Sequence, residues 1–159
     1  MTPEPRLRRS ARVLLFDERG DVLLIRFRAQ RSDGPYTCWV TPGGEVEADE
    51  SDRVTAEREL YEELGIRPEL VGPVHEASGG EYEHLGERVR NSDVFFAAQT
   101  ERAKPRLAGV TVEEIALMQE ARWWSSNELK SAAEPVFPVD IVKVAEAAWE
   151  RVSAGNQAG

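Results

Sequence analysis

Short hydrophobic runs separated by turn sequences predict most of the strands in this chain. The run at 10–16 is rich in Val and Leu and ends at the turn sequence 17–20, and the run at 21–27 suits a hairpin partner. Further strands are predicted at 36–40, 70–74, 89–98 and 121–124, and the polar stretch 76–88 is interpreted as a strand tip and a mobile loop. An apolar stripe after Pro138 predicts a final helix. Alternating strands and a few helices indicate an α/β layered domain.

The stretch 43–66 predicts the central helix of the fold. Asp49, Glu50 and Ser51 are residue types favoured where a helix begins, and Gly65 suits the left-handed position where a helix ends. At about 100° per residue, the helix has one apolar half and one acidic half. The apolar half holds Val54, Ala56, Leu60, Tyr61 and Leu64, and the acidic half holds Glu59, Glu62 and Glu63.

The three glutamates of this helix are neighbours, because they are spaced i, i+3 and i+4. Their like charges cost roughly 0.2–0.5 kcal/mol per pair when nothing binds them. A hard divalent cation such as Mg²⁺ prefers oxygen ligands and turns this repulsion into a site. The sharp turn 41–44 lets backbone carbonyls approach the same ion. For the glutamates taken alone, a solvated acidic face is the commoner explanation.

The spacing of the whole stretch favours the metal site over the solvated face. Gly44 is followed after five residues by Glu50, and after seven more by the block Arg58-Glu59-Leu60-x-Glu62-Glu63-x-Gly65-Ile66. This pattern resembles the signature of the Nudix hydrolases at every fixed position, and the preceding Pro42-Gly43 is also similar to that family. So many restricted positions are far more specific than a lone glycine loop.

The resemblance implies a fold and an activity. The expected fold is α/β, a Nudix-type α/β/α sandwich with a mixed β-sheet, formed by a single domain over residues 1–159 with loose tails at 1–7 and 153–159. The expected activity is metal-dependent hydrolysis of a diphosphate linkage in a nucleoside diphosphate linked to another group, as in nucleoside triphosphates, dinucleoside polyphosphates or nucleotide sugars. The cofactor would be Mg²⁺ or Mn²⁺.

The resemblance also assigns roles to residues of the helix and its preceding turn. Glu59, Glu62 and Glu63 would hold the metal together with the carbonyl of Gly43. Arg58 and Glu50 look like the pair that braces the loop against the helix. The identity of the general base stays open, because relatives use either a glutamate of the signature or one on a late loop. The candidates are Glu59, Glu114 and Glu120, with Glu113 as a further alternative.

Substrate selection is expected outside the signature, in the segments 26–36, 79–90 and 121–124. The residues chosen as substrate-binding are Arg26 and Arg28 at the end of a strand, Tyr36 and Trp124. Solvated loop charge is the competing explanation for the arginines. Trp123 and Trp124 point to opposite faces of a strand, so one belongs to the core and the other could reach a ligand. The resemblance to the family implies that Trp39, which closely precedes Pro-Gly-Gly, is part of the scaffold.

Charge and composition narrow the partners. The net charge of −9 argues against duplex nucleic acid, and no run approaches the roughly 20 apolar residues that cross a membrane. Arginines interrupt the N-terminal segment, so no signal peptide is expected. The single cysteine, Cys38, fits a reducing cytoplasm and suits a small buried residue better than a nucleophile. The expected partner is a small diphosphate substrate, and a homodimer stays open.

Two other functions compete with hydrolysis. A Nudix-fold module that senses a nucleotide without cleaving it would normally lack some of the signature glutamates, and this chain keeps all of them. A diphosphate isomerase on the same fold would normally bring catalytic cysteine chemistry, for which Cys38 alone in an apolar stretch is weak support.

Overall fold

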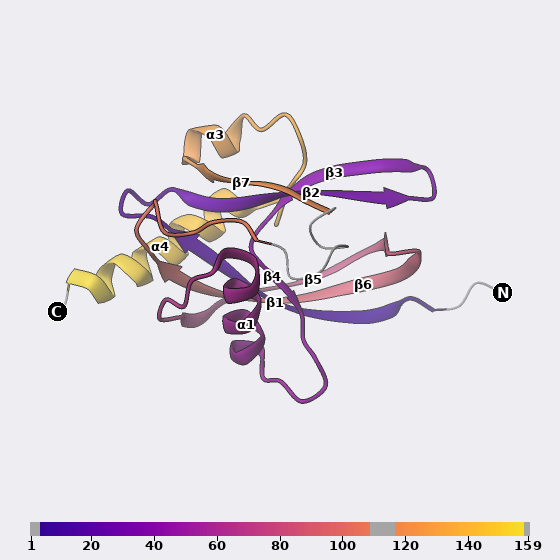
Figure 1. Cartoon of the computed structure of the whole chain (residues 1–159), viewed down its shortest axis with the longest axis horizontal. Coiled ribbons are helices and arrows are strands. Elements are labelled where there is room, and N and C mark those ends of the chain that lie inside the picture. The colour runs from indigo at the N-terminus through magenta and orange to yellow at the C-terminus, as the bar shows by residue number, and fades with distance from the viewer. Residues whose placement is uncertain (1–3, 109–116, 158–159) are drawn as a thin grey trace.

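A computed structural model describes residues 4–108 and 117–157 of the chain. Within these residues a sheet of eight strands combines with three helices (Figure 1). In chain order the elements are β1 Arg6–Phe16, β2 Val22–Arg31, β3 Gly34–Val40, β4 Gly43–Glu45, α1 Asp52–Leu64, β5 Val71–His84, β6 Glu87–Gln99, β7 Met118–Trp124, α3 Ser126–Lys130, β8 Val136–Phe137 and α4 Ile141–Gln157.

The sheet is mixed and divides into two parts. β1 runs parallel to β6 along its whole length, whereas the register between β1 and β2 is limited to the pair Phe16↔Val22. β1 also pairs with β4, and β2 pairs with β3 and β7. We call β5, β6, β1 and β4 the first half-sheet, and β7, β2, β3 and β8 the second half-sheet. They meet at the start of β2 and diverge towards the right of Figure 1.

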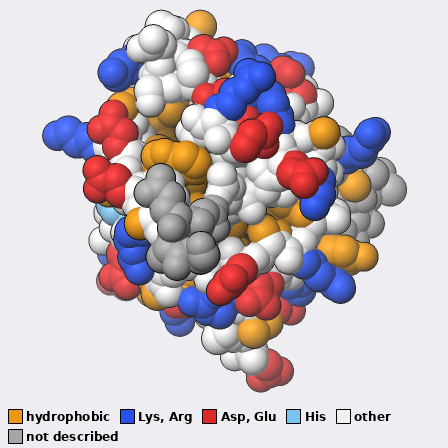
Figure 2. All heavy atoms as spheres, turned by 90° about the vertical axis from the view of Figure 1, so that its left-hand side faces the viewer, with side chains coloured by type: hydrophobic (Ala, Val, Ile, Leu, Met, Phe, Trp, Pro, Cys, Tyr) orange, Lys and Arg blue, Asp and Glu red, His pale blue; other side chains and the backbone are white. Residues whose placement is uncertain are grey.

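Hydrophobic clusters lie on both faces of the sheet. The alternation along β1 sends Leu14 and Phe16 into the cluster that includes α4, and Val13 and Leu15 into the cluster that includes α1. These four side chains are at most 1% exposed. Helices therefore cover both faces of one mixed sheet, which confirms the predicted α/β/α sandwich. On the face drawn in Figure 2, acidic and basic side chains are interspersed around small apolar patches.

The structure differs from the sequence prediction at the ends of several elements. The segment 76–88 is not a mobile loop, because β5 and β6 continue through it as paired strands and turn at Leu85 and Gly86. β1 begins at Arg6, within the predicted N-terminal tail, because that residue pairs with Val89 of β6. The last helix starts at Ile141 and extends to Gln157, past the residue where fraying was expected.

Candidate active site

Helix α1 begins and ends where the sequence predicted. The Ser51 side chain accepts a hydrogen bond from the Val54 N–H, and Gly65 adopts the left-handed conformation at φ 70° and donates to the Tyr61 carbonyl. The buried face differs from the predicted one, since Val54 and Tyr61 are 49% and 47% exposed. The helix instead buries the narrower stripe Thr55, Ala56, Leu60 and Leu64.

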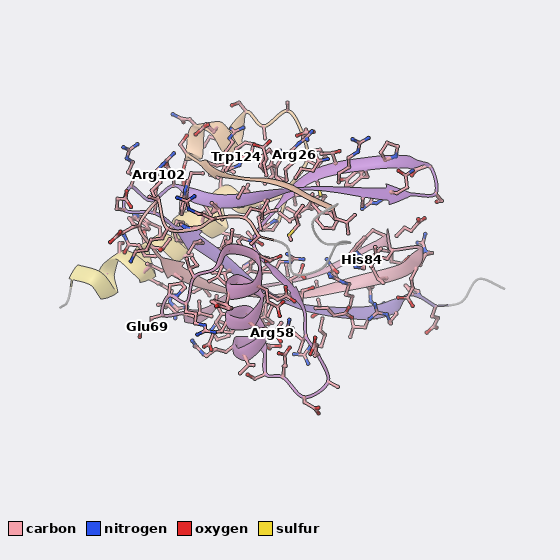
Figure 3. All side chains as sticks on the ribbon, in the orientation of Figure 1. Arg26, Arg58, Glu69, His84, Arg102 and Trp124 are labelled. Atoms are coloured by element: carbon pink, nitrogen blue, oxygen red, sulfur yellow. The ribbon has the colours of Figure 1, made fainter. Side chains whose placement is uncertain are left out.

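The guanidinium of Arg58, which is labelled on α1 in Figure 3, donates hydrogen bonds to three glutamates. It holds both oxygens of Glu50, at 2.6 Å and 2.8 Å, and its Nη1 donates to Glu59 at 3.0 Å and to Glu62 at 3.1 Å. Hydrogen bonding to Arg58 lowers the pKa of Glu50 to about 2, and the same bonds raise the pKa of Arg58. The Thr55 hydroxyl also donates to Glu50. This network fixes the loop before α1 to the acidic flank of the helix.

The glycine turn before the helix packs against two of its carboxylates. The Gly43 N–H donates to Glu63 Oε1 at 2.9 Å. A Cβ on Gly44 would lie 2.5 Å from Glu59 Oε1, so any larger residue there would have to displace that carboxylate. A Cβ on Gly43 would overlap the Ala11 carbonyl of β1. The two glycines therefore allow the backbone of β4 to lie directly between β1 and α1.

A cleft of about 1000 Å³ opens between the two half-sheets. Its floor comes from β1, β5 and β6, and its roof comes from β2 and β3. Glu59 and Glu63 line the cleft beside β4. The floor contributes Arg8, Arg12, Tyr82, His84, Asn91, Asp93 and Phe95, and the roof contributes Ile25, Phe27, Ala29, Arg31, Tyr36 and Cys38.

A match to the model of the NUDIX domain covers residues 6–143 of the chain, which include the helix, the glycine turn and the cleft. The chain belongs to the Nudix family. It is 41% identical over 80 residues to an RNA pyrophosphohydrolase from Roseobacter denitrificans, an alignment that covers 48% of each protein. The chain thus spans about half the length of this curated relative.

Solved structures agree with the Nudix fold. The MutT protein from Methanosarcina mazei Go1 superimposes with a TM-score of 0.66 at 23% identity, covering 98% of this chain and 99% of that one. The dihydroneopterin triphosphate pyrophosphohydrolase of E. coli gives a TM-score of 0.61 at 19% identity, with 95% and 99% covered. None of the helices within residues 4–108 and 117–157 is long and apolar enough to cross a membrane.

Three of the predicted metal ligands of this Nudix domain, Glu59, Glu62 and Glu63, belong to α1, and the fourth, the carbonyl of Gly43, belongs to β4 next to it. Among the described residues, no three acidic, His or Cys side chains converge into a ready-made metal cluster, because Glu59 and Glu62 share Arg58 and Glu63 accepts from Gly43. The predicted donors are nonetheless all oxygens, three carboxylates and one backbone carbonyl, which suit Mg²⁺ or Mn²⁺. Gly44 has no side chain to fill the space next to the Glu59 carboxylate, where a Cβ would lie 2.5 Å from Oε1. The residues therefore fit the ion that the family implies.

Of the predicted substrate-binding residues, Tyr36 lines the cleft. Arg26 and Arg28 alternate with the lining residues of β2 and belong to its other face, where Arg26 forms hydrogen bonds with Glu134 at 2.7 Å and 3.0 Å. Trp124 does not line the cleft: it is 4% exposed and packs edge-on against Trp39 inside the core, while Trp123 packs in the cluster on the α1 face. Trp39 is a scaffold residue, as expected.

The candidates for the general base lie in three different places. Glu120 is exposed on β7, opposite Arg26 of β2, and is not among the described residues that line the cleft. Glu114 and Glu113 lie outside the described residues. Glu59 lines the cleft, and its side chain is 14% exposed. Of the candidates that the structure describes, Glu59 is therefore the one that lines the cleft.

The polar residues of the cleft floor were not singled out from the sequence. Arg8 and Arg12 come from β1, and His84 comes from β5 and lies between the half-sheets (Figure 3). Burial, followed by the charge of Arg8, lowers the pKa of His84 to about 4, so this imidazole is neutral at pH 7. In the roof, burial raises the pKa of the Cys38 thiol, which makes it a weaker nucleophile.

Proposed function

We propose that the protein is a Nudix pyrophosphohydrolase that uses Mg²⁺ or Mn²⁺ to cleave a diphosphate linkage in a nucleoside diphosphate linked to another group. The observation that carries this proposal is the shared cleft. Glu59 and Glu63 lie at one flank of it, and the arginines Arg8, Arg12 and Arg31 line its interior. Carboxylates suit the metal and guanidinium groups suit an anionic substrate, and both are needed for a protein whose net charge is −9.

The residues of the cleft and of the adjacent flank of α1 have separate roles in the proposed hydrolysis. Arg58 holds Glu59 and Glu62 on the same flank of α1, and the Gly43 N–H orients Glu63. A divalent cation bound there supplies charge neutralisation for the diphosphate and activates water near neutral pH. Glu59 is our first candidate to accept the proton of that water, because its carboxylate already lines the cleft. Arg12 and Arg31, which also line the cleft, attract the remaining charge of the substrate.

The substrate class is proposed from relatives as well as from chemistry. The Roseobacter denitrificans relative is an RNA pyrophosphohydrolase, so a triphosphorylated RNA 5′ end joins the nucleoside triphosphates, dinucleoside polyphosphates and nucleotide sugars as a candidate. That relative and the structurally similar dihydroneopterin triphosphate pyrophosphohydrolase of E. coli are both named as pyrophosphohydrolases. A single-stranded end does not conflict with the expectation that duplex nucleic acid is excluded.

The test is a substrate screen with purified protein and Mg²⁺, read by released phosphate, pyrophosphate and monophosphate. We expect turnover of at least one of these diphosphate classes, and loss of turnover in excess chelator. Glu63→Gln should lose most of the rate, whereas Glu57→Gln, an exposed glutamate on the same helix, should keep it. Full turnover in excess chelator would overturn the metal assignment. A complete lack of turnover with every class would favour the nucleotide-sensing module.

The isomerase alternative is less well supported. Its cysteine chemistry would require a reactive thiolate, and the one cysteine of the chain is 7% exposed with a raised pKa.

We also propose that residues 1–159 act as a single domain. A reducing, cytoplasmic setting is proposed as well, because a buried unpaired thiol is suited to it. Size-exclusion chromatography with light scattering would decide between a monomer and the homodimer left open by the sequence.

A further inference from the structure

Unsatisfied polar atoms are concentrated in the cleft. Five buried side-chain nitrogen or oxygen atoms of the described residues have no hydrogen-bond partner. Four of them belong to residues that line the cleft, namely Arg8, Arg31, Thr41 and Asp93. A buried polar atom without a hydrogen-bond partner is uncommon and destabilising, so four such atoms in one cleft need an explanation. A ligand that supplies the missing partners is the simplest one.

The adjacent strands β1 and β6 of the floor carry a donor and an acceptor that make no hydrogen bond. Parallel pairing of β1 with β6 sets Arg8 beside Asn91 and Ser10 beside Asp93. The Arg8 side chain is 9% exposed and its Nη1 donates to Ser10, while its Nε lies 3.9 Å from Glu45 Oε2 in an ion pair and has no hydrogen-bond partner. Asp93 is 14% exposed and accepts from Asn91 through Oδ2, while its Oδ1 lies 3.9 Å from Arg12 Nε in an ion pair and has no hydrogen-bond partner.

A hydrogen-bonded chain links these two groups. Arg8 Nη1 lies 3.4 Å from the Tyr82 hydroxyl, which donates to Asn91 Oδ1 at 2.8 Å, and the Asn91 amide donates to Asp93. The floor is therefore ordered before a ligand arrives, with a cationic donor at one end and an anionic acceptor at the other. A phosphate offers acceptor oxygens to Arg8, but its charge would be repelled by Asp93. The ligand must carry both donors and acceptors.

The opposite wall of the cleft is suited to a flat ring. The roof contributes the aromatic residues Phe27 and Tyr36. The Arg31 guanidinium lies 3.8 Å from the centre of the Tyr36 ring, so this surface already stacks on a planar group. Aromatic faces above a polar edge are the arrangement in which proteins recognise a nucleobase.

We propose that the cleft floor selects guanine, with Asp93 accepting from the N1–H and 2-amino groups of the base and Arg8 donating to O6. Guanine presents two adjacent donors next to an acceptor on this edge, which matches a carboxylate beside a guanidinium. Adenine presents one amino donor next to a ring acceptor, which would face the carboxylate unpaired. This inference rests on the proposed function, in that the substrate is a nucleotide, and it names the base which that nucleotide carries.

The test compares 5′-monophosphates, which lack a diphosphate linkage and bind without turning over. Isothermal titration calorimetry with Mg²⁺ should show GMP binding at least about tenfold tighter than AMP, as expected for one bidentate contact to a base. Asp93→Asn exchanges one acceptor oxygen for an amide donor, so it should weaken GMP about tenfold or more and favour XMP, whose 2-oxo group is an acceptor. Asp33→Asn, an exposed aspartate in the β2–β3 turn, is the charge-matched control.

Equal binding of GMP and AMP would overturn the proposal, as would GMP binding too weak to detect at millimolar concentration or an Asp93→Asn protein that keeps its preference for GMP. If Asp93→Asn fails to fold by circular dichroism, Arg8→Lys tests the other contact. That variant keeps the charge, loses Nε, and should reduce the preference for GMP over AMP. Hydrolysis without base preference would refute this inference and leave the proposed function standing. Selective GMP binding without hydrolysis of any diphosphate class would support this inference and refute the proposed function.

Discussion

Arg58 donates to both oxygens of the Glu50 carboxylate, with Nε 2.6 Å from Oε2 and Nη2 2.8 Å from Oε1. Glu50 precedes α1 and Arg58 lies in its middle, so this contact ties the loop to the helix. The Thr55 hydroxyl donates to the same Glu50, and Arg58 also reaches Glu59 and Glu62. One guanidinium thereby determines where the carboxylates of the site lie.

Arg58→Lys should lower kcat/KM by about 10- to 100-fold, because lysine keeps the charge but cannot form the two-point contact that positions the carboxylates. Steady-state kinetics with the substrate found in the screen provides the measurement. Arg53→Lys is the control on the same helix, since Arg53 donates to the carbonyls of Leu70 and Gly72 and has no carboxylate partner in the described structure. It should reduce the melting temperature without a comparable loss of rate. Equal rate losses in both variants would argue against a positioning role for Arg58.

Glu62→Gln should lower kcat by roughly 10²–10³-fold and raise the Mg²⁺ concentration needed for half-maximal rate. The variant removes one of the charges that would bind the cation, while the half-buried Arg58 contact contributes only about 0–1 kcal/mol to folding. The melting temperature should therefore change little. Glu57→Gln, which is exposed on the same helix, should retain both the rate and the Mg²⁺ dependence. A Glu62→Gln enzyme with wild-type kcat would remove Glu62 from the metal site.

Gly44→Ala should cost about 10²-fold in kcat/KM while the domain still folds, since the added methyl group must displace the Glu59 carboxylate. Gly80→Ala provides the comparison, because a Cβ there meets no atom within 4 Å. Melting curves of both variants should resemble the wild-type curve. If Gly44→Ala is fully active, the close approach of β4 to Glu59 has no bearing on the chemistry.

The general base can be found by comparing three Glu→Gln variants. We expect Glu59→Gln to lower kcat by about 10²–10⁴-fold and to remove the acidic limb of the pH–rate profile. Glu120→Gln should stay within a few-fold of wild type, because its exposed side chain is outside the cleft. A large loss confined to Glu114→Gln, with Mg²⁺ affinity unchanged, would move the base to the segment 109–116.

Acidification should destabilise the fold through His84. Its pKa is lowered to about 4, against an ordinary value of 6.5, so the unfolded chain binds the proton more readily than the folded one. The free energy of unfolding should therefore fall as the pH drops from 6.5 towards 4. Chemical denaturation between pH 7 and pH 4.5 measures this, above the range where Glu50 loses its contribution. His84→Gln should flatten the pH dependence, and an unchanged slope would count against His84 as its source.

The sequence was sufficient for α1 and its acidic flank, because caps, spacing and the family signature are local. Ser51, Gly65 and the glutamates could be placed without knowing any other element. The floor of the cleft could not be found in this way, since Arg8 and Asp93 come together only through the parallel register of β1 with β6. Strand segments such as 76–88 were missed because their polar residues face the cleft and solvent, where no apolar alternation marks them.

Strand alternation also left the faces undecided. Arg26 and Arg31 belong to the same strand, and the sequence favoured Arg26, whereas Arg31 lines the cleft. The register of β2 against β7 shifts between Arg26 and Phe27, and no local signal marks such an irregularity. Trp124 was predicted to bind substrate for a similar reason. Two adjacent tryptophans of a strand face opposite sides, and the sequence does not tell which side faces the core with α4.

The narrow junction between the half-sheets has a consequence for protein engineering. The roof strands β2 and β3 form one continuous hairpin that ends before the glycine turn, and it meets β1 at the pair Phe16↔Val22. Near its tip, Ser32 donates to Glu83 of β5. Exchange of the hairpin between relatives should therefore be possible, provided that its pairing with β7 and core residues such as Leu24 and Trp39 are kept. Such chimeras would combine the glutamates of α1 with different cleft roofs.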